Sequence, residues 1–188
     1  MIETCKDGRA ADLARSLGVS PPTVLRYVDL LADLMLVRRL TPHFVNVGKR
    51  LAKAPRLYVR DSGLLHALLG IVSRDDLFSH PVIGASWEGF VIENLIAAAP
   101  FGTDAAFYRT RSGAEADLVM RLPDGKRWAI EVKLSEAPRI PRGFRIAAAD
   151  VKADRRYLVY RGEETFALSP DTTAIPLPEL MKRLVALR

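Results

Sequence analysis

Asp117, Glu131 and Lys133 lie in the segment ADLVMRLPDGKRWAIEVKL, which reads as two alternating strands joined by Pro123-Asp124-Gly125. If Gly125 takes the left-handed position of a three-residue loop, the pairing runs outward until Asp117 lies opposite Glu131. Like charges directly opposite each other destabilise a sheet, so a cation is expected close to this pair. Lys133 shares a strand face with Glu131 and is one candidate, and a divalent metal is another. The same alternation is also typical of an exposed hairpin that carries charges on its polar face.

Glu88 is a third carboxylate that could join this pair. The segment SWEGFVIENLIAAA, residues 86–99, predicts a helix that ends before Pro100. Val91, Ile92 and Leu95 follow Glu88 by three, four and seven residues, so Glu88 lies on the apolar face of that helix. A buried carboxylate is costly unless it is paired or bound to a metal. If the helix packs on the sheet, Glu88 can approach the other two carboxylates.

Three carboxylates and a lysine suit metal-dependent hydrolysis of a phosphodiester. We expect Asp117, Glu131 and Glu88 to be oxygen ligands for Mg²⁺ or Mn²⁺. Such a metal polarises the phosphoryl oxygen and lowers the pKa of a bound water molecule. Lys133 would position the attacking hydroxide and stabilise the developing charge.

The surrounding elements predict an α/β domain over residues 61–188. The order from residue 86 is α-β-β-β-α-β, a sheet with helices packed on it. The expected elements are a helix at 86–99, strands at 105–110, 116–122 and 126–134, a helix at 144–151, strands at 156–160 and 173–177, and a helix at 178–187.

The first 60 residues predict a separate winged helix-turn-helix domain. Apolar residues recur at helical spacing over 11–17 and stop at Gly18, and a second helix begins at Pro21 after the N-cap residue Ser20. A strand and a basic segment follow, as in a winged variant. In such a motif the start of the second helix reads the major groove. The same module also serves protein packing, and this alternative stays open.

The candidate nucleic-acid contacts come from three places. The reading helix offers three side chains, the wing offers three cations on phosphates, and two arginines bracket the end of the strand before the hairpin. In that order they are Thr23, Arg26 and Tyr27, then Lys49, Arg50 and Lys53, and finally Arg109 and Arg111.

Composition and charge favour a cytoplasmic globular protein with a polyanionic partner. The chain is 49% hydrophobic and 27% charged, with one cysteine and no apolar run long enough to span a bilayer. We expect no membrane contact, no signal peptide and no internal disulfide. Residues 1–60 carry eleven Lys and Arg against five Asp and Glu, whereas the remainder carries seventeen of each. The excess positive charge of the first domain fits a nucleic-acid partner, with DNA preferred, and it fits an ordinary solvated surface equally well.

Asp117 and the triplet Glu131-Val132-Lys133 within this element order resemble the PD-(D/E)XK nuclease superfamily, with Ala116 in place of its usual proline. The segments GASWEGFVIENL, FYRTRSGAEADLV and AIEVKL, together with KRLAKAPRLYVRDSGLLHALLG, resemble the C-terminal region of a group of prokaryotic AAA+ ATPases. In that group an ATPase domain precedes a winged helix and a nuclease-like domain of unknown function. The resemblance implies a restriction-endonuclease-like fold with Glu88, Asp117, Glu131 and Lys133 as site positions. It also implies an AAA+ ATPase domain, upstream or separate, as a partner.

This sequence contains no phosphate-binding loop of the form G-x-x-x-x-G-K-[ST], because His43 stands where the first glycine before Gly48-Lys49 is required. We therefore expect a C-terminal fragment of an ATP-binding protein that does not itself hydrolyse ATP. Its nuclease-like domain would cleave DNA, or it would be a non-enzymatic DNA- or protein-binding module with a relic site. A weaker alternative is a helix-turn-helix regulator whose α/β domain senses a ligand.

Overall fold

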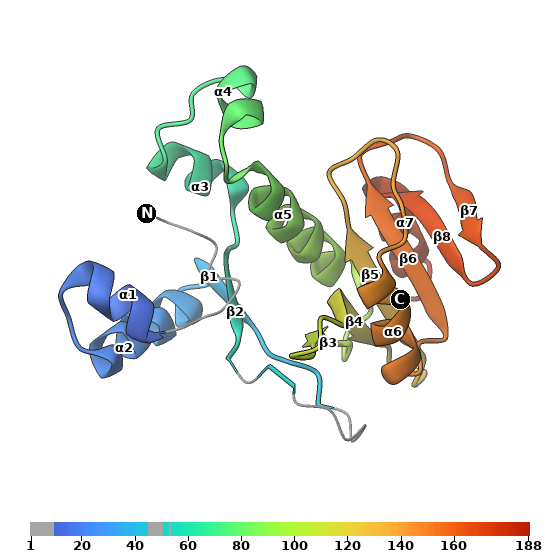
Figure 1. Ribbon diagram of the computed structural model, residues 1–188, viewed down its shortest axis with the longest axis horizontal. Coiled ribbons are helices and arrows are strands. Elements are labelled where there is room, and N and C mark those ends of the chain that lie inside the picture. The colour runs from blue at the N-terminus through green and yellow to red at the C-terminus, as the bar shows by residue number, and fades with distance from the viewer. Residues whose placement is uncertain (1–9, 45–50, 53) are drawn as a thin grey trace. The chain divides into compact units, whose positions relative to one another are not determined.

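The computed structural model describes residues 10–44, 51–52 and 54–188, and the chain divides into two compact units (Figure 1). The first unit comprises residues 1–41 and 54–89, and the second comprises residues 42–53 and 90–188. The division predicted at residue 60 differs from these units, because residues 61–89 belong with the first unit. Residues 42–53 belong with the second.

The first unit contains the two predicted helices of the helix-turn-helix. Its elements are α1 (Ala10–Leu17), α2 (Pro21–Asp33), β1 (Val37–Leu40), β2 (Arg56–Val59), α3 (Ser62–Leu68) and α4 (Arg74–Ser79). Gly18 has a φ of +66°, and the Ser20 side chain accepts a hydrogen bond from the Thr23 N–H at 3.3 Å. The turn and the cap are therefore formed as the sequence predicts, and β1 pairs antiparallel with β2.

The short helices α3 and α4 were not predicted from periodicity. Asp61 caps α3 by accepting from the Leu64 N–H, and Ser73 with Asp76 forms a capping box at the start of α4. The S-x-x-D pattern at residues 73–76 was the available sequence signal. Helices of six and seven residues are too short to show a convincing apolar stripe.

The second unit is built on a six-stranded sheet in the order β3-β4-β5-β6-β8-β7 (Figure 1). The pairs β3–β4, β4–β5 and β7–β8 are antiparallel, whereas β5, β6 and β8 run parallel. The strands are β3 (Asp104–Arg109), β4 (Glu115–Arg121), β5 (Arg127–Val132), β6 (Arg155–Tyr160), β7 (Phe166–Ser169) and β8 (Thr172–Pro176). Every predicted strand of this domain is found, and β7 was missed.

Helices cover both faces of this sheet: α6 (Arg142–Asp150) lies on one and α7 (Leu177–Val185) on the other (Figure 1). The helix α6 makes the crossover between the parallel strands β5 and β6, as such a connection requires. Phe144, Ala147 and Ala148 form its buried stripe, which packs against β4 and β5 together with Val151, the residue after the helix. The predicted α/β architecture is confirmed, whereas the winged helix and the restriction-endonuclease-like fold stay predictions.

The helix α5 (Ile83–Ala98) contains the boundary between the two units, after Gly89. Beyond that point Val91, Ile92 and Leu95 are fully buried. The predicted apolar stripe is therefore real. Among the residues that the structure describes, no helix has the length and apolar character needed to cross a membrane.

The segment that follows β1 pairs with the outer strand β3 of the second unit. The His43 N–H donates to the Phe107 carbonyl at 2.6 Å, and the Ala52 N–H donates to the Arg109 carbonyl at 2.9 Å. Leu51 also packs against the core beneath α6. These contacts satisfy part of the edge of β3, which would otherwise expose unpaired backbone groups.

Candidate active site

The hairpin β4–β5 brings two buried carboxylates, Asp117 and Glu131, close enough for the charge of one to raise the pKa of the other. Gly125 has a φ of +84°, and the Leu122 N–H donates to the Lys126 carbonyl at 2.9 Å, which confirms the predicted loop. The paired register ends at Leu118 and Ile130, one step before Asp117 and Glu131. Between Ala116 and Val119, β4 carries one residue more than β3, so the register is irregular where Asp117 lies. Both side chains are only 5% exposed.

Asp117 is held by the backbone of the opposite strand. Its Oδ2 accepts a hydrogen bond from the Val132 N–H at 3.0 Å. This bond takes the place of a regular ladder bond at the end of the hairpin. It fixes a carboxylate next to a second carboxylate, which costs electrostatic energy unless a cation offsets it.

Lys133 supplies a cation at this pair. Its Nζ donates to Glu131 Oε1 at 2.6 Å, and the lysine side chain remains 37% exposed. The other oxygen, Glu131 Oε2, is buried and has no hydrogen-bond partner among the described residues. The site therefore retains a buried acceptor that the lysine does not satisfy.

The pKa of Glu131 is raised to about 8. Burial is the largest cause, and the charge of Asp117 is the next. The charge and the hydrogen bond of Lys133 oppose this shift only in part, and Glu115 adds to it. A raised carboxyl pKa with a specific charged neighbour is typical of functional sites, although structural networks produce it too.

Glu115 is a member of this acidic cluster that the sequence reasoning missed. It lies two residues before Asp117 on β4, and its charge contributes to the raised pKa of Glu131. Its Oε2 lies 4.0 Å from Arg109 Nε, which places one predicted phosphate-binding arginine next to the cluster. The sequence signal that could have identified Glu115 is its position two residues before Asp117, directly before the predicted strand at 116–122.

The chain around Glu115 is fixed by a close contact with the start of α6. A Cβ added at Gly143 would lie 2.4 Å from the Gly113 carbonyl oxygen and 3.6 Å from the Glu115 N. Only glycine permits this approach of the two backbones. Gly143 therefore helps to set the position of the strand that carries Glu115 and Asp117.

Glu88 is buried, as predicted, but its partners lie in the first unit. Its Oε1 accepts hydrogen bonds from the Tyr58 hydroxyl at 2.7 Å and from an Arg56 guanidinium nitrogen at 3.3 Å. The sequence argument that this carboxylate needs a partner is correct, and β2 provides two. Its role as a metal ligand stays a prediction.

Within residues 10–44, 51–52 and 54–188, no three His, Cys, Asp or Glu side chains are grouped closely enough to hold a metal ion. The structure brings Asp117, Glu131 and Lys133 together.

The structure describes some of the candidate nucleic-acid contacts, and others lie outside the described residues. The hydroxyl of Thr23 lies 2.8 Å from that of Ser20 and belongs to the helix cap. Arg26 and Tyr27 are exposed on α2, and Tyr27 is 63% exposed. The predicted wing cations Lys49, Arg50 and Lys53 lie outside the described residues. In the second unit Arg111 is exposed in the turn before β4.

The fold and the site define the class of this protein. It contains an α/β domain that carries two buried carboxylates and a lysine at the end of a β-hairpin. The chain belongs to the family described as a domain of unknown function, DUF4143, which matches residues 83–180 and is usually the C-terminal region of AAA-ATPase-like proteins. Residues 6–75 match a second domain of unknown function, DUF8612.

Two curated relatives come from mycobacteria. The chain is 45% identical over 172 residues to the uncharacterized protein Rv2008c of Mycobacterium tuberculosis and, equally, to the uncharacterized protein Mb2031c of Mycobacterium bovis. The match covers 91% of this chain and 38% of each relative, so the chain spans well under half of their length. No solved structure matches the chain.

Proposed function

We propose that the second unit is a divalent-metal-dependent nuclease domain that hydrolyses phosphodiester bonds of DNA at Asp117 and Glu131, with the help of Lys133. One observation carries the proposal: Glu131 Oε2 is buried and without a hydrogen-bond partner among the described residues, beside a second buried carboxylate. A buried oxygen of this kind is costly unless something binds it. A hard cation is the ligand that two adjacent carboxylates suit best.

The donor set fits Mg²⁺ or Mn²⁺. Mg²⁺ is usually bound by one or two carboxylates and keeps several water molecules, so a third protein carboxylate is not essential. Once bound, the metal would polarise a phosphoryl oxygen and lower the pKa of a water molecule. Asp117, whose Oδ2 accepts a hydrogen bond from the Val132 N–H, would serve as one ligand, and Glu131 would ionise as the cation binds.

Lys133 has a second role in this proposal. Its Nζ contacts Glu131 Oε1, yet more than a third of its side chain is exposed. A flexible ammonium group at that position can hold the attacking water and stabilise charge on the phosphate. Arg109, which lies near Glu115, would contact a neighbouring phosphate of the same strand.

The test is cleavage of supercoiled plasmid DNA by the purified chain in Mg²⁺, in Mn²⁺ and in EDTA. Asp117→Asn and Lys133→Met are each expected to lower the cleavage rate at least about 100-fold. Glu136→Gln is the matched control, because Glu136 is an exposed carboxylate paired with Arg161 near the same strand end. Equal cleavage by the wild type and both site variants, or no metal dependence, would overturn the proposal.

A second candidate is a non-enzymatic binding region that retains a relic of the site. The contacts of Glu88 favour this second candidate, because its carboxylate is already bound by Arg56 and Tyr58. The exposed surface of α2 favours this candidate too: Leu25 and Leu30 on the helix and Leu34 directly after it are each at least 45% exposed, and Arg26 is the only cation of the helix. This candidate predicts binding of DNA or of an ATPase-type partner domain without any cleavage, and an Asp117→Asn chain that binds as well as the wild type.

A further inference from the structure

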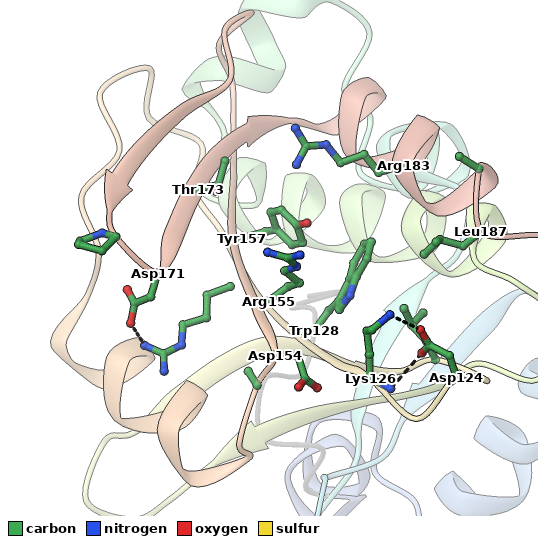
Figure 2. A pocket seen from close by; sticks show the side chains of 15 residues that line it. Asp124, Lys126, Trp128, Asp154, Arg155, Tyr157, Asp171, Thr173, Arg183 and Leu187 are labelled. Carbon is green, nitrogen blue, oxygen red and sulfur yellow. Dashed lines mark hydrogen bonds and ion pairs between the residues drawn. The ribbon is translucent and has the colours of Figure 1, made fainter.

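A cavity of about 740 Å³ lies in the second unit, at the end of the sheet opposite the carboxylates (Figure 2). It is lined by the first residues of β5, β6 and β8, by the adjoining loops and by the last turns of α7. Trp128 is the second residue of β5, whereas Glu131 is close to its end. The cavity is therefore separate from the candidate active site, and its size lies within the range of small-molecule pockets, roughly 300–1,000 Å³.

Two aromatic side chains form the floor of the cavity. Trp128 and Tyr157 are each 6% exposed, and their rings meet edge to face with centroids 5.1 Å apart. The indole Nε1 of Trp128 is buried and has no acceptor among the residues that the structure describes. A buried indole N–H normally has a partner, so this donor indicates a missing acceptor.

Four cations surround this floor, and two of them are already neutralised. Lys126 Nζ contacts Asp124 Oδ2 at 2.8 Å, and Arg156 is paired with Asp171, as the dashed lines in Figure 2 show. These two pairs leave little net charge on their side of the cavity.

Arg155 and Arg183 are the other two cations, and neither has a carboxylate within ion-pair distance among the described residues. Arg183 lies over the Tyr157 ring, 5.9 Å from its centroid. Figure 2 shows the two guanidinium groups on either side of Tyr157. The nearby Asp154 accepts instead from the Arg127 N–H at 2.7 Å.

We propose that this cavity binds a small organic anion that carries a flat ring. The anionic group, a phosphate or a carboxylate, would lie between Arg155 and Arg183, since the planar guanidinium donates two parallel hydrogen bonds to either. The ring would lie on the aromatic floor, with one of its acceptors directed toward Trp128 Nε1.

The indole resonances of the ¹⁵N-labelled chain test this proposal directly. The chain contains two tryptophans, so Trp87→Phe leaves the Trp128 N–H as the single indole signal. Adenosine monophosphate and 2-naphthoate are the probes, and they distinguish a phosphate from a carboxylate. At least one of them is expected to shift the Trp128 signal in a saturable way, whereas adenosine and inorganic phosphate bind at least tenfold more weakly because each lacks one half of the ligand.

Variants of the two arginines identify the site. Arg155→Gln and Arg183→Gln are each expected to weaken binding about tenfold or more, as for the loss of a charge-assisted hydrogen bond. Arg145→Gln, on the exposed side of α6, is the matched control and leaves binding unchanged. Calorimetry on the wild-type chain repeats the comparison without the Trp87 substitution.

Three results would overturn the proposal. The first is the absence of any shift at millimolar concentrations of both probes. The second is equal binding by the wild type and the two arginine variants. The third is inorganic phosphate binding as tightly as adenosine monophosphate, which would show an adventitious ion only. The measurement involves no DNA cleavage, so its outcome is independent of the proposed nuclease activity.

Discussion

The carboxylate of Asp117 accepts a hydrogen bond from the Val132 N–H, so that one strand of the hairpin fixes the acidic side chain of the other. Val132 is flanked by Glu131 and Lys133, the other two members of the site. One backbone contact therefore locates Asp117 relative to both residues. The rigidity of the sheet, rather than that of a loop, sets the geometry.

The raised pKa of Glu131 predicts a pH-dependent stability of the metal-free chain. Between the unperturbed pKa of 4.5 and about 8, the folded state holds a proton that the unfolded state releases. This stabilisation is complete below pH 4.5 and is lost as the pH rises through 8. Each unit of pKa shift corresponds to about 1.4 kcal/mol.

Urea unfolding in EDTA from pH 5 to pH 9 measures this effect against Glu131→Gln. The variant cannot ionise at this position, so its free energy of unfolding should overtake that of the wild type by pH 9. Parallel curves for the two proteins across this range would contradict the assignment.

Gly143→Ala should destabilise the second unit by about 1–3 kcal/mol, because the added methyl group would collide with the Gly113 carbonyl. Gly84→Ala is the matched control: its added Cβ meets nothing within 4 Å, so this change in α5 should be neutral or stabilising by up to about 1 kcal/mol. Guanidinium denaturation measures both. Equal free energies of unfolding for the two variants would show that the close contact between Gly143 and the Gly113 carbonyl does not contribute to stability.

Arg56→Met should destabilise the metal-free chain by about 3–5 kcal/mol, because it removes the buried guanidinium that pairs with the buried Glu88 carboxylate. Tyr58→Phe removes one hydrogen bond to the same oxygen and should cost about 1–2 kcal/mol. Thermal and chemical unfolding in EDTA provide the readout. If Glu88 instead serves only a metal, both changes should leave the metal-free stability nearly unaltered.

Arg26→Ala should weaken DNA binding by the chain about threefold to tenfold at low salt if α2 reads DNA, because one phosphate or base contact is lost. Arg15→Ala is the control, since Arg15 lies on α1, is exposed and pairs with Asp12. Fluorescence anisotropy with a labelled duplex at two salt concentrations measures the difference. Equal losses for both variants would indicate only a change in net charge and would favour protein contact by α2.

The sequence by itself predicted the local elements well, because the signals that define them lie within a few residues of each other. Pro123-Asp124-Gly125 fixed the hairpin loop and the register as far as Leu118 and Ile130. Beyond that point β4 is irregular, and the hydrogen bond from the Val132 N–H holds Asp117 near Glu131. Ser20 and Gly18 marked the boundaries of two helices in the same way. The helices α3 and α4 were missed because six or seven residues show too little periodicity.

Only the tertiary structure decided which partners the buried charges take. The position of Glu88 on the apolar face of its helix predicted that the carboxylate needs a partner. Arg56, which is that partner, lies thirty-two residues away in the sequence, and no local pattern connects the two residues. The cavity beside Trp128 likewise needs α7, which follows β5 by more than forty residues, to be folded against the sheet. Periodicity shows which face of an element is buried. The choice of the element that covers this face depends on long-range packing, which a local pattern does not record.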